Sequence, residues 1–126
     1  MSLEISVSTR PWMDGRQMAM VGLVGTLDTA TAPQLDQELH RLFDGPTQIL
    51  VFNLAKLTFL SSGGVRVLLA ARKRVLERNG SCMMLRTPPR IEKTFEIIEA
   101  LGGMMFFRDD VALDAFLAAL QKPAQG

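Results

Sequence analysis

The sequence predicts a single α/β domain with one mixed, mostly parallel sheet of about five strands and about four helices, in the order β-β-α-β-α-β-α-β-α. Strand-like apolar segments alternate with segments of helical spacing along most of the 126 residues, which is typical of strand–helix–strand crossovers. The uninterrupted apolar run Ile49–Phe52 indicates a central strand covered on both faces. The alternation of apolar and polar residues over Leu3–Thr9 indicates a half-exposed edge strand.

The first half of the chain predicts two strands, a helix and a third strand. The pair Asp14-Gly15 turns the chain, so Leu3–Thr9 and Gln17–Val24 are expected to pair antiparallel. A loop follows, and three leucines at helical spacing predict a helix over Ala32–Phe43, with Thr31 as its N-cap. A turn with glycine and proline then leads to a strand over Gln48–Leu54.

The second half continues the alternation of helix and strand. Asn79-Gly80 suits the end of one helix, and a Thr-Pro-Pro break precedes the next helix. The expected elements are helices at Gly64–Arg78 and Ile91–Ala100, strands at Ser81–Arg86 and Met104–Phe107, and a last helix from Asp109 or Asp110 to Leu120. We expect residues 1–120 to form the domain and residues 121–126 to be a flexible tail.

Composition narrows the classes of function. The net charge is +1, which gives no general attraction to nucleic acid or to anionic membranes. His40 and Cys82 are the only histidine and the only cysteine, so a typical zinc site and an internal disulfide are not expected. No run approaches the length of a membrane span, and no signal-peptide pattern or P-loop is present. The sequence therefore predicts a cytoplasmic protein without cofactor, metal or membrane insertion.

The most informative segment is Leu57–Leu69, which holds two serines and two glycines between apolar stretches. Ser61 or Ser62 at the start of a helix suits an N-cap, because its oxygen can accept from an unpaired amide of the first turn. A helix N-terminus also favours a phosphate group. The residues alone therefore leave open a cap, a phosphate acceptor, or both.

Three segments resemble the STAS domain family, the sulfate transporter and anti-sigma factor antagonist family. Gly25-Thr26-Leu27-Asp28 is similar to the family's Gly-x-Leu-Asp before its first helix, and Ile49–Leu54 is similar to its apolar strand. Phe59–Leu69 is similar to its Asp-Ser-Ser-Gly-Leu-Gly junction and helix. The resemblance extends from about Leu3 to Leu120, and it implies the family's fold.

The junction departs from the commonest family pattern at several positions. Ser62 falls on the position of the phosphoacceptor serine, whereas Ser61 and Asn53 stand where the family usually has aspartate. Gly63 stands where the family has a second serine, and Arg66 matches a branch with Ser-Ser-Ala-Gly-Leu-Arg. Ser62 is thus the first choice for the acceptor, and Ser61 is the second.

The resemblance implies an anti-sigma factor antagonist that is not an enzyme. Such a protein binds a kinase-like anti-sigma factor, is released when that partner phosphorylates its serine with ATP, and is reset by a PP2C-type phosphatase. Gly63 and Gly64 would let the kinase backbone approach closely. The expected partner-binding residues are Asp28, Thr29, Ser61, Ser62, Gly63, Gly64 and Arg66.

Two alternatives remain at this stage. The chain could be a soluble STAS subunit of a membrane transporter of the lipid-trafficking ATP-binding-cassette type, without phosphorylation. It could also be a small serine hydrolase with His40 as base, although the Gly-x-Ser-x-Gly elbow is missing around Ser62. The basic residues of the helix after Gly64 are interpreted first as a solvated face, next as a docking surface for an acidic partner, and last as a nucleic-acid site.

Overall fold

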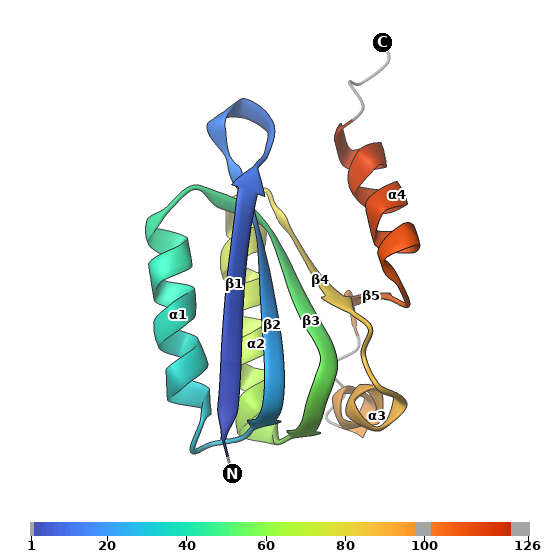
Figure 1. Cartoon of the computed structure of the whole chain (residues 1–126). Coiled ribbons are helices and arrows are strands. Elements are labelled where there is room, and N and C mark those ends of the chain that lie inside the picture. The colour runs from blue at the N-terminus through green and yellow to red at the C-terminus, as the bar shows by residue number, and fades with distance from the viewer. Residues whose placement is uncertain (1, 98–101, 122–126) are drawn as a thin grey trace.

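The computed structural model describes residues 2–97 and 102–121 and contains a five-stranded mixed sheet in the order β1-β2-β3-β4-β5 (Figure 1). β1 pairs antiparallel with β2, and the remaining neighbours pair in parallel. The strands are β1 (Leu3–Pro11), β2 (Gln17–Leu27), β3 (Thr47–Leu60), β4 (Ser81–Leu85) and β5 (Met105–Phe107), and the helices are α1 (Ala32–Asp44), α2 (Ser62–Glu77), α3 (Pro89–Ile97) and α4 (Asp110–Gln121). The predicted fold class, element order and antiparallel edge are confirmed.

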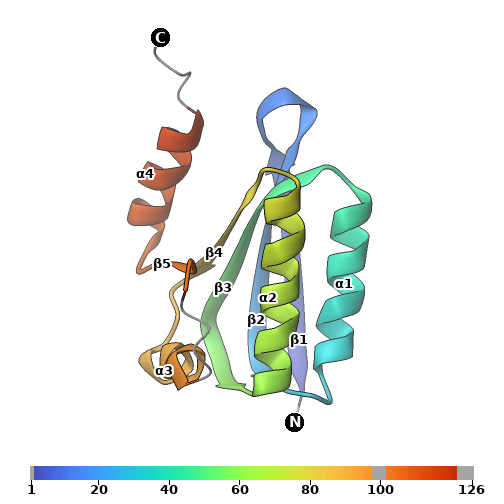
Figure 2. The same cartoon turned by 180° about the vertical axis from the view of Figure 1, so that it is seen from behind.

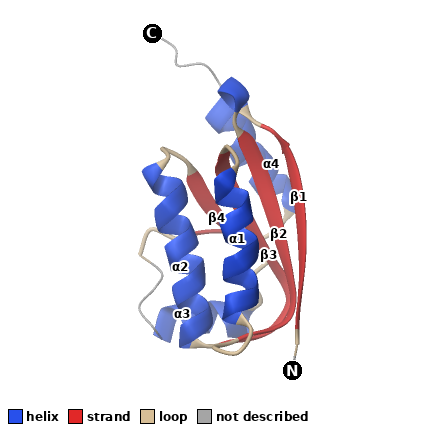
Figure 3. Ribbon diagram, turned by 90° about the vertical axis from the view of Figure 1, so that its left-hand side faces the viewer, coloured by secondary structure: helices blue, strands red, loops and turns tan. Residues whose placement is uncertain are grey.

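Helices cover both faces of the sheet, but unequally. α1 and α2 lie side by side on one face (Figure 2), and Ile91 and Phe95 of α3 join the same core cluster. α4 lies on the opposite face (Figure 3), where Leu113 and Leu117 pack on the sheet. Within β3, Leu50 and Phe52 belong to the first cluster, whereas Ile49 and Val51 belong to the second. The expectation of a central strand covered on both faces is confirmed.

β2 and β3 are longer than the sequence predicts. Gly25–Leu27 is strand rather than loop, and β3 continues past Leu54 to Leu60. Register shifts near residues 22–26 keep Leu57 and Leu60 buried, and Gly25 takes a φ of 105°, which favours glycine. A bulge of this kind breaks the two-residue period by which a strand is recognised. The extension carries the chain to the edge where Ser61 begins the turn into α2.

Smaller differences concern element ends. α3 begins at Pro89, two residues before the predicted Ile91, and the predicted end at Ala100 lies outside the described residues. α4 ends at Gln121 rather than Leu120, so the first residue of the predicted tail at 121–126 is helical, and the rest of that tail lies outside the described residues. No helix in the described part of the chain is long and apolar enough to cross a membrane.

The basic side of α2 is only partly a solvated face. The Arg78 guanidinium donates to the carbonyl oxygens of Gly45 at 2.8 Å and of Phe43. These hydrogen bonds connect α2 to the turn between α1 and β3. Arg72 donates to the Gly103 carbonyl at 3.0 Å. Arg74 remains exposed, with its guanidinium 4.4 Å from the centre of the Phe43 ring. The interpretation as a solvated face is therefore wrong for Arg72 and Arg78, which tie distant turns together.

Cys82 on β4 gives the fold a predictable response to alkali. Burial raises the pKa of its thiol from the ordinary 9.0 to about 12, against a smaller opposing effect of Arg72. The unfolded chain therefore loses this proton first, and the stabilisation present below pH 9.0 is lost as the pH rises toward about 12. We expect the free energy of unfolding to fall across this range more steeply in the natural protein than in Cys82→Ala, as measured by urea denaturation. Parallel pH profiles for the two proteins would contradict this expectation.

Candidate functional site

Three chain segments meet at the carboxyl ends of β2 and β3. They are the loop before α1, the end of β3 and the first turn of α2, all at the lower edge of the sheet in Figure 1. The Ser61 amide donates to the Leu27 carbonyl at 3.0 Å, which joins the ends of the two strands directly. We call this region the Ser62 edge; its surface includes Asp28, Thr29, Phe59, Ser62 and Arg66. Because the carboxyl ends of parallel strands share one edge, residues far apart in sequence become neighbours here.

Ser61 and Ser62 have different structural roles. Ser61 is the N-cap of α2: its backbone is extended, and its Oγ accepts from the Gly64 amide at 3.2 Å. Ser62 is the first residue of the helix and is exposed, and its hydroxyl forms no hydrogen bond within the described part of the chain. One serine thus holds the helix start, and the other presents a hydroxyl to solvent.

The Ser61 cap leads to a test of why serine can replace aspartate here. Both side chains accept from an amide in the first helical turn. Ser61→Ala should lower the free energy of unfolding by about 1 kcal/mol, whereas Ser61→Asp should leave it nearly unchanged. Urea denaturation of the two variants measures the difference. An unchanged free energy of unfolding in Ser61→Ala would show that the hydrogen bond to the Gly64 amide does not stabilise the helix, and equal losses in both variants would show that aspartate does not replace serine as the cap.

The two glycines are needed mainly because other residues of the same chain pack closely against them. Gly64 is buried, and a Cβ there would lie 2.7 Å from the Leu27 carbonyl oxygen and 2.9 Å from Leu60 Cδ1. A Cβ on Gly63 would lie 2.7 Å from Thr29 Oγ1. The space beside Gly64, which was expected to admit a kinase backbone, is therefore occupied by Leu27 and Leu60. The glycines allow α2 to start directly against the end of β2.

The loop before α1 is ordered by Asp28 rather than by Thr31. Asp28 Oδ1 accepts from the amides of Ala30 at 2.9 Å and Thr31 at 3.0 Å. The Thr31 hydroxyl instead points back, donating to the Thr26 carbonyl at 2.8 Å and accepting from the Asp28 amide at 3.0 Å. Thr31 occupies the predicted N-cap position of α1, but its side chain makes no capping hydrogen bond to the first turn of the helix. Its hydroxyl closes the loop, which leaves Thr29 exposed beside Gly63.

Two residues near Ser62 complete the surface. Arg66 is exposed and lies four residues after Ser62, on the same helix face. Phe59 is 49 % exposed at the end of β3, a large apolar side chain that sequence reasoning did not single out. The available signal was the neighbouring Leu60: in an extended strand an inward Leu60 turns Phe59 outward.

Other predicted residues lie elsewhere. Asn53 Oδ1 accepts from the Ala55 amide at 3.1 Å, and Asn53 lines a shallow cavity with Ser6 and Lys56 on the outer sheet face. His40 is exposed on α1, and its Nδ1 contacts the Asp36 carbonyl oxygen at 2.8 Å rather than a serine. The described residues bring no histidine to Ser62, and they contain no group of three or more metal-binding side chains.

Comparisons with known proteins agree with this architecture. The family model of the STAS domain matches residues 13–112. BtrV of Bordetella bronchiseptica, named as an anti-sigma factor antagonist, is 31 % identical over 80 residues, which is 64 % of this chain and 69 % of that protein.

Solved structures show the same fold. An anti-sigma factor antagonist from Mycobacterium paratuberculosis superposes with a TM-score of 0.73 at 24 % identity, covering 96 % of each chain. The anti-sigma factor antagonist SpoIIAA in its unphosphorylated form superposes with a TM-score of 0.70 at 22 % identity, covering 90 % of this chain and 97 % of that one. A structure of SpoIIAA from Bacillus in its phosphorylated form gives a TM-score of 0.63 at 22 % identity, covering 88 % of this chain and 99 % of that one.

Proposed function

Because the chain belongs to the STAS domain family, we propose that it is an anti-sigma factor antagonist whose binding to a kinase-like anti-sigma factor is switched off by phosphorylation of Ser62. The observation that carries this proposal is the exposed hydroxyl of Ser62, the first residue of α2, which makes no hydrogen bond to the described residues. The helix is capped separately by Ser61. The hydroxyl can be modified without loss of the cap.

A phosphate on Ser62 is compatible with the folded domain. It would add about −1.5 to −2 charge at neutral pH, and the positive end of the α2 dipole favours such a charge by roughly 0.3 to 2 kcal/mol. The exposed Arg66 guanidinium, one turn further along the helix, is a second favourable charge. The modified protein should therefore remain folded.

The same phosphate opposes burial in an interface. An uncompensated anion in a partner interface costs several kcal/mol, and a loss of about 3 kcal/mol weakens binding on the order of a hundredfold. The switch thus acts on association, while the free antagonist keeps its structure. The expected contact surface consists of Asp28, Thr29, Ser61, Ser62, Gly63 and Arg66, with the buried Gly64 supporting it from below.

Phe59 extends this surface with an apolar anchor. Aromatic side chains dominate the binding energy of many interfaces because they bury large areas at small entropic cost. Phe59→Ala should weaken anti-sigma factor binding on the order of tenfold to a hundredfold, because about half of this side chain is free to be covered. Isothermal titration calorimetry measures the Kd of each complex. The matched control is Val111→Ala on α4, because Val111 is 79 % exposed and lies away from the Ser62 edge. If Phe59→Ala and the natural protein bind the anti-sigma factor with equal affinity, Phe59 is not part of the interface.

The proposed partner follows from the resemblance to anti-sigma factor antagonists. Transfer of a phosphoryl group to Ser62 requires a kinase and a phosphoryl donor such as ATP. The resemblance implies that this kinase is an anti-sigma factor of the histidine-kinase-like ATPase fold and that a PP2C-type phosphatase restores the hydroxyl. The named function of BtrV supports an anti-sigma factor as the binding partner. The cytoplasm, where sigma factors act, is the proposed location.

The proposal is tested with a kinase-like anti-sigma factor from the same genome. Gel filtration should show a complex with the unmodified chain in ADP and dissociation after incubation in ATP, and Ser62→Ala should stay bound in both. Dissociation of Ser62→Ala in ATP would contradict the role of Ser62. Failure to bind in either nucleotide, with co-purification of a transporter permease, would instead support a transporter subunit.

A further inference from the structure

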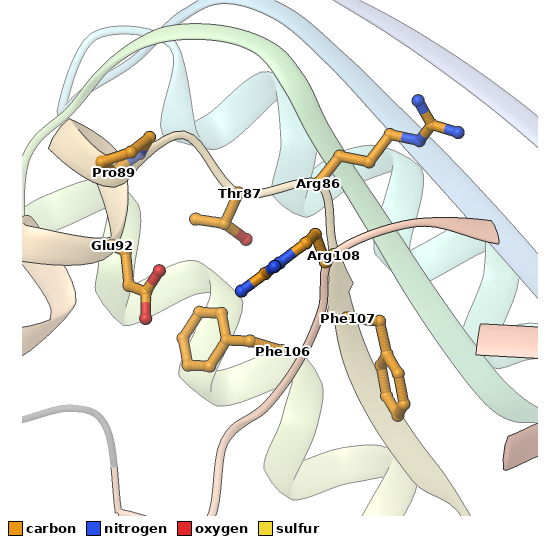
Figure 4. A pocket seen from close by; sticks show the side chains of 7 residues that line it. All are labelled: Arg86, Thr87, Pro89, Glu92, Phe106, Phe107 and Arg108. Atoms are coloured by element: carbon orange, nitrogen blue, oxygen red, sulfur yellow. The ribbon is translucent and has the colours of Figure 1, made fainter. Parts of the chain in front are cut away.

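A cavity lies apart from the Ser62 edge, at the carboxyl ends of β4 and β5. It has a volume of about 460 Å³ and lies between these strand ends and the start of α3 (Figure 4). None of its lining residues belongs to the Ser62 edge. Its volume is within the range of small-molecule sites, and the carboxyl ends of parallel strands are where open α/β sheets bind ligands.

One guanidinium group in this cavity is free to bind an anion. The Arg108 side chain points toward Thr87 and Glu92 (Figure 4), and it forms no ion pair or hydrogen bond with the described residues. Arg86 is different, because its guanidinium is held by Asp110 at 3.0 Å outside the cavity. Arg108 is therefore the one guanidinium among the described lining residues that forms no ion pair.

The wall next to Arg108 carries an unsatisfied hydroxyl. Thr87 Oγ1 is shut off from solvent and has no hydrogen-bond partner within the described residues. Buried hydroxyls of this kind are uncommon, because the lost hydrogen bond to water is not replaced. The preceding residue, Arg86, has a φ of 55°, which is rare for a residue with a side chain and is often found at functional sites. The chain thus holds Thr87 in place at a local energetic cost.

An aromatic wall completes the cavity. Phe106 is half-buried, and its ring packs edge-on against Phe95 with the ring centres 5.6 Å apart. Its remaining surface lies beside the Arg108 guanidinium (Figure 4). An anionic group and an apolar group of one ligand would thus find neighbouring contacts.

We propose that this cavity binds a small organic carboxylate with an apolar body, independently of the Ser62 switch. The carboxylate would accept from the Arg108 guanidinium, for which its planar geometry is suited. Rotation of the half-buried Thr87 side chain, which lines the cavity, would let its unpartnered hydroxyl donate to the same carboxylate. The apolar body would cover Phe106. The Glu92 carboxylate on the opposite wall disfavours a phosphate, which carries more negative charge than one carboxylate.

Phenylacetate is a suitable probe, and amide NMR shifts of the full chain are the readout. Phenylacetate should give saturable shifts at Thr87, Phe106 and Arg108 with a Kd of about 1 mM or below. Benzylamine should give none, and phenyl phosphate should bind more weakly. Arg108→Gln should weaken phenylacetate binding at least about tenfold, whereas Arg90→Gln should not, because Arg90 is exposed on α3 and does not line the cavity.

Several results would overturn the proposal. These are the absence of shifts at about 10 mM phenylacetate, equal binding of benzylamine, tighter binding of phenyl phosphate, or unchanged binding in Arg108→Gln. Thr87→Val supplies a separate test that does not depend on the ligand. Removing an unpaired buried hydroxyl should raise the Tm by about 3 °C while weakening phenylacetate binding. A lower Tm would show that the hydroxyl is satisfied and would contradict its role as a ligand contact.

Discussion

Replacing Ser62 with glutamate is expected to abolish anti-sigma factor binding while the domain stays folded. The carboxylate places a negative charge on the first residue of α2, where the helix dipole favours it by about 0.3 to 1 kcal/mol. The same charge would be buried without a partner in the complex, which should raise the Kd on the order of a hundredfold. Calorimetric titration measures the affinity, and thermal denaturation measures the stability of the free variant.

Ser62→Gln is the matched control, because it has the size of glutamate without its charge. It should bind the anti-sigma factor more tightly than Ser62→Glu. If both variants lose binding equally, steric exclusion rather than charge explains the loss. If Ser62→Glu melts well below the natural protein, the charge acts on folding, and the proposed switch at the interface is wrong.

Replacing Gly64 with alanine is expected to destabilise the whole domain. The new Cβ would lie 2.7 Å from the Leu27 carbonyl oxygen, 2.8 Å from Leu27 Cγ and 2.9 Å from Leu60 Cδ1. Two of these atoms belong to the side chains of buried leucines and the third is a backbone oxygen, so α2 must shift away from the sheet. Overpacking of this kind costs about 1–3 kcal/mol, which should lower the Tm by roughly 5–10 °C.

Gly102→Ala is the control for the Gly64 variant. A Cβ on Gly102 would meet no heavy atom of the described chain within 4 Å, so its Tm should change little. Gly63→Ala should fall between the two, because its new Cβ would meet the Thr29 hydroxyl oxygen, the end of a short side chain that can rotate. Similar Tm values for the Gly64 and Gly102 variants would contradict the close approach of α2 to β2.

The arrangement of elements could be predicted from the sequence because each depends on local patterns. Apolar periodicity and turn residues such as Asp14-Gly15 indicate strands and helices one at a time, and the handedness and pairing rules then order them in a sheet. The extension of β3 to Leu60 was not predictable in this way. It depends on bulges that place extra residues in β3 opposite β2, and these exist only when the two strands are paired.

The candidate site was predictable as a segment but not as a surface. The sequence identifies Ser61 and Ser62 at a helix start, and the structure assigns the cap to Ser61. The close packing at Gly64, the exposure of Phe59 and the hydrogen bonds that turn Thr31 inward depend on residues about 30 positions apart or on the path of a loop. Arg78 is a similar case, since a basic residue on a helix does not reveal that it binds carbonyl oxygens of another turn.

The most direct test of the proposed switch is the position of the phosphate after incubation with ATP and the kinase-like anti-sigma factor. Fragmentation mass spectrometry should find one phosphoryl group, on Ser62, in the natural protein and in Ser61→Ala, and none in Ser62→Ala. A phosphate on Ser61, or an equally phosphorylated Ser62→Ala protein, would contradict the separation of roles between the two serines.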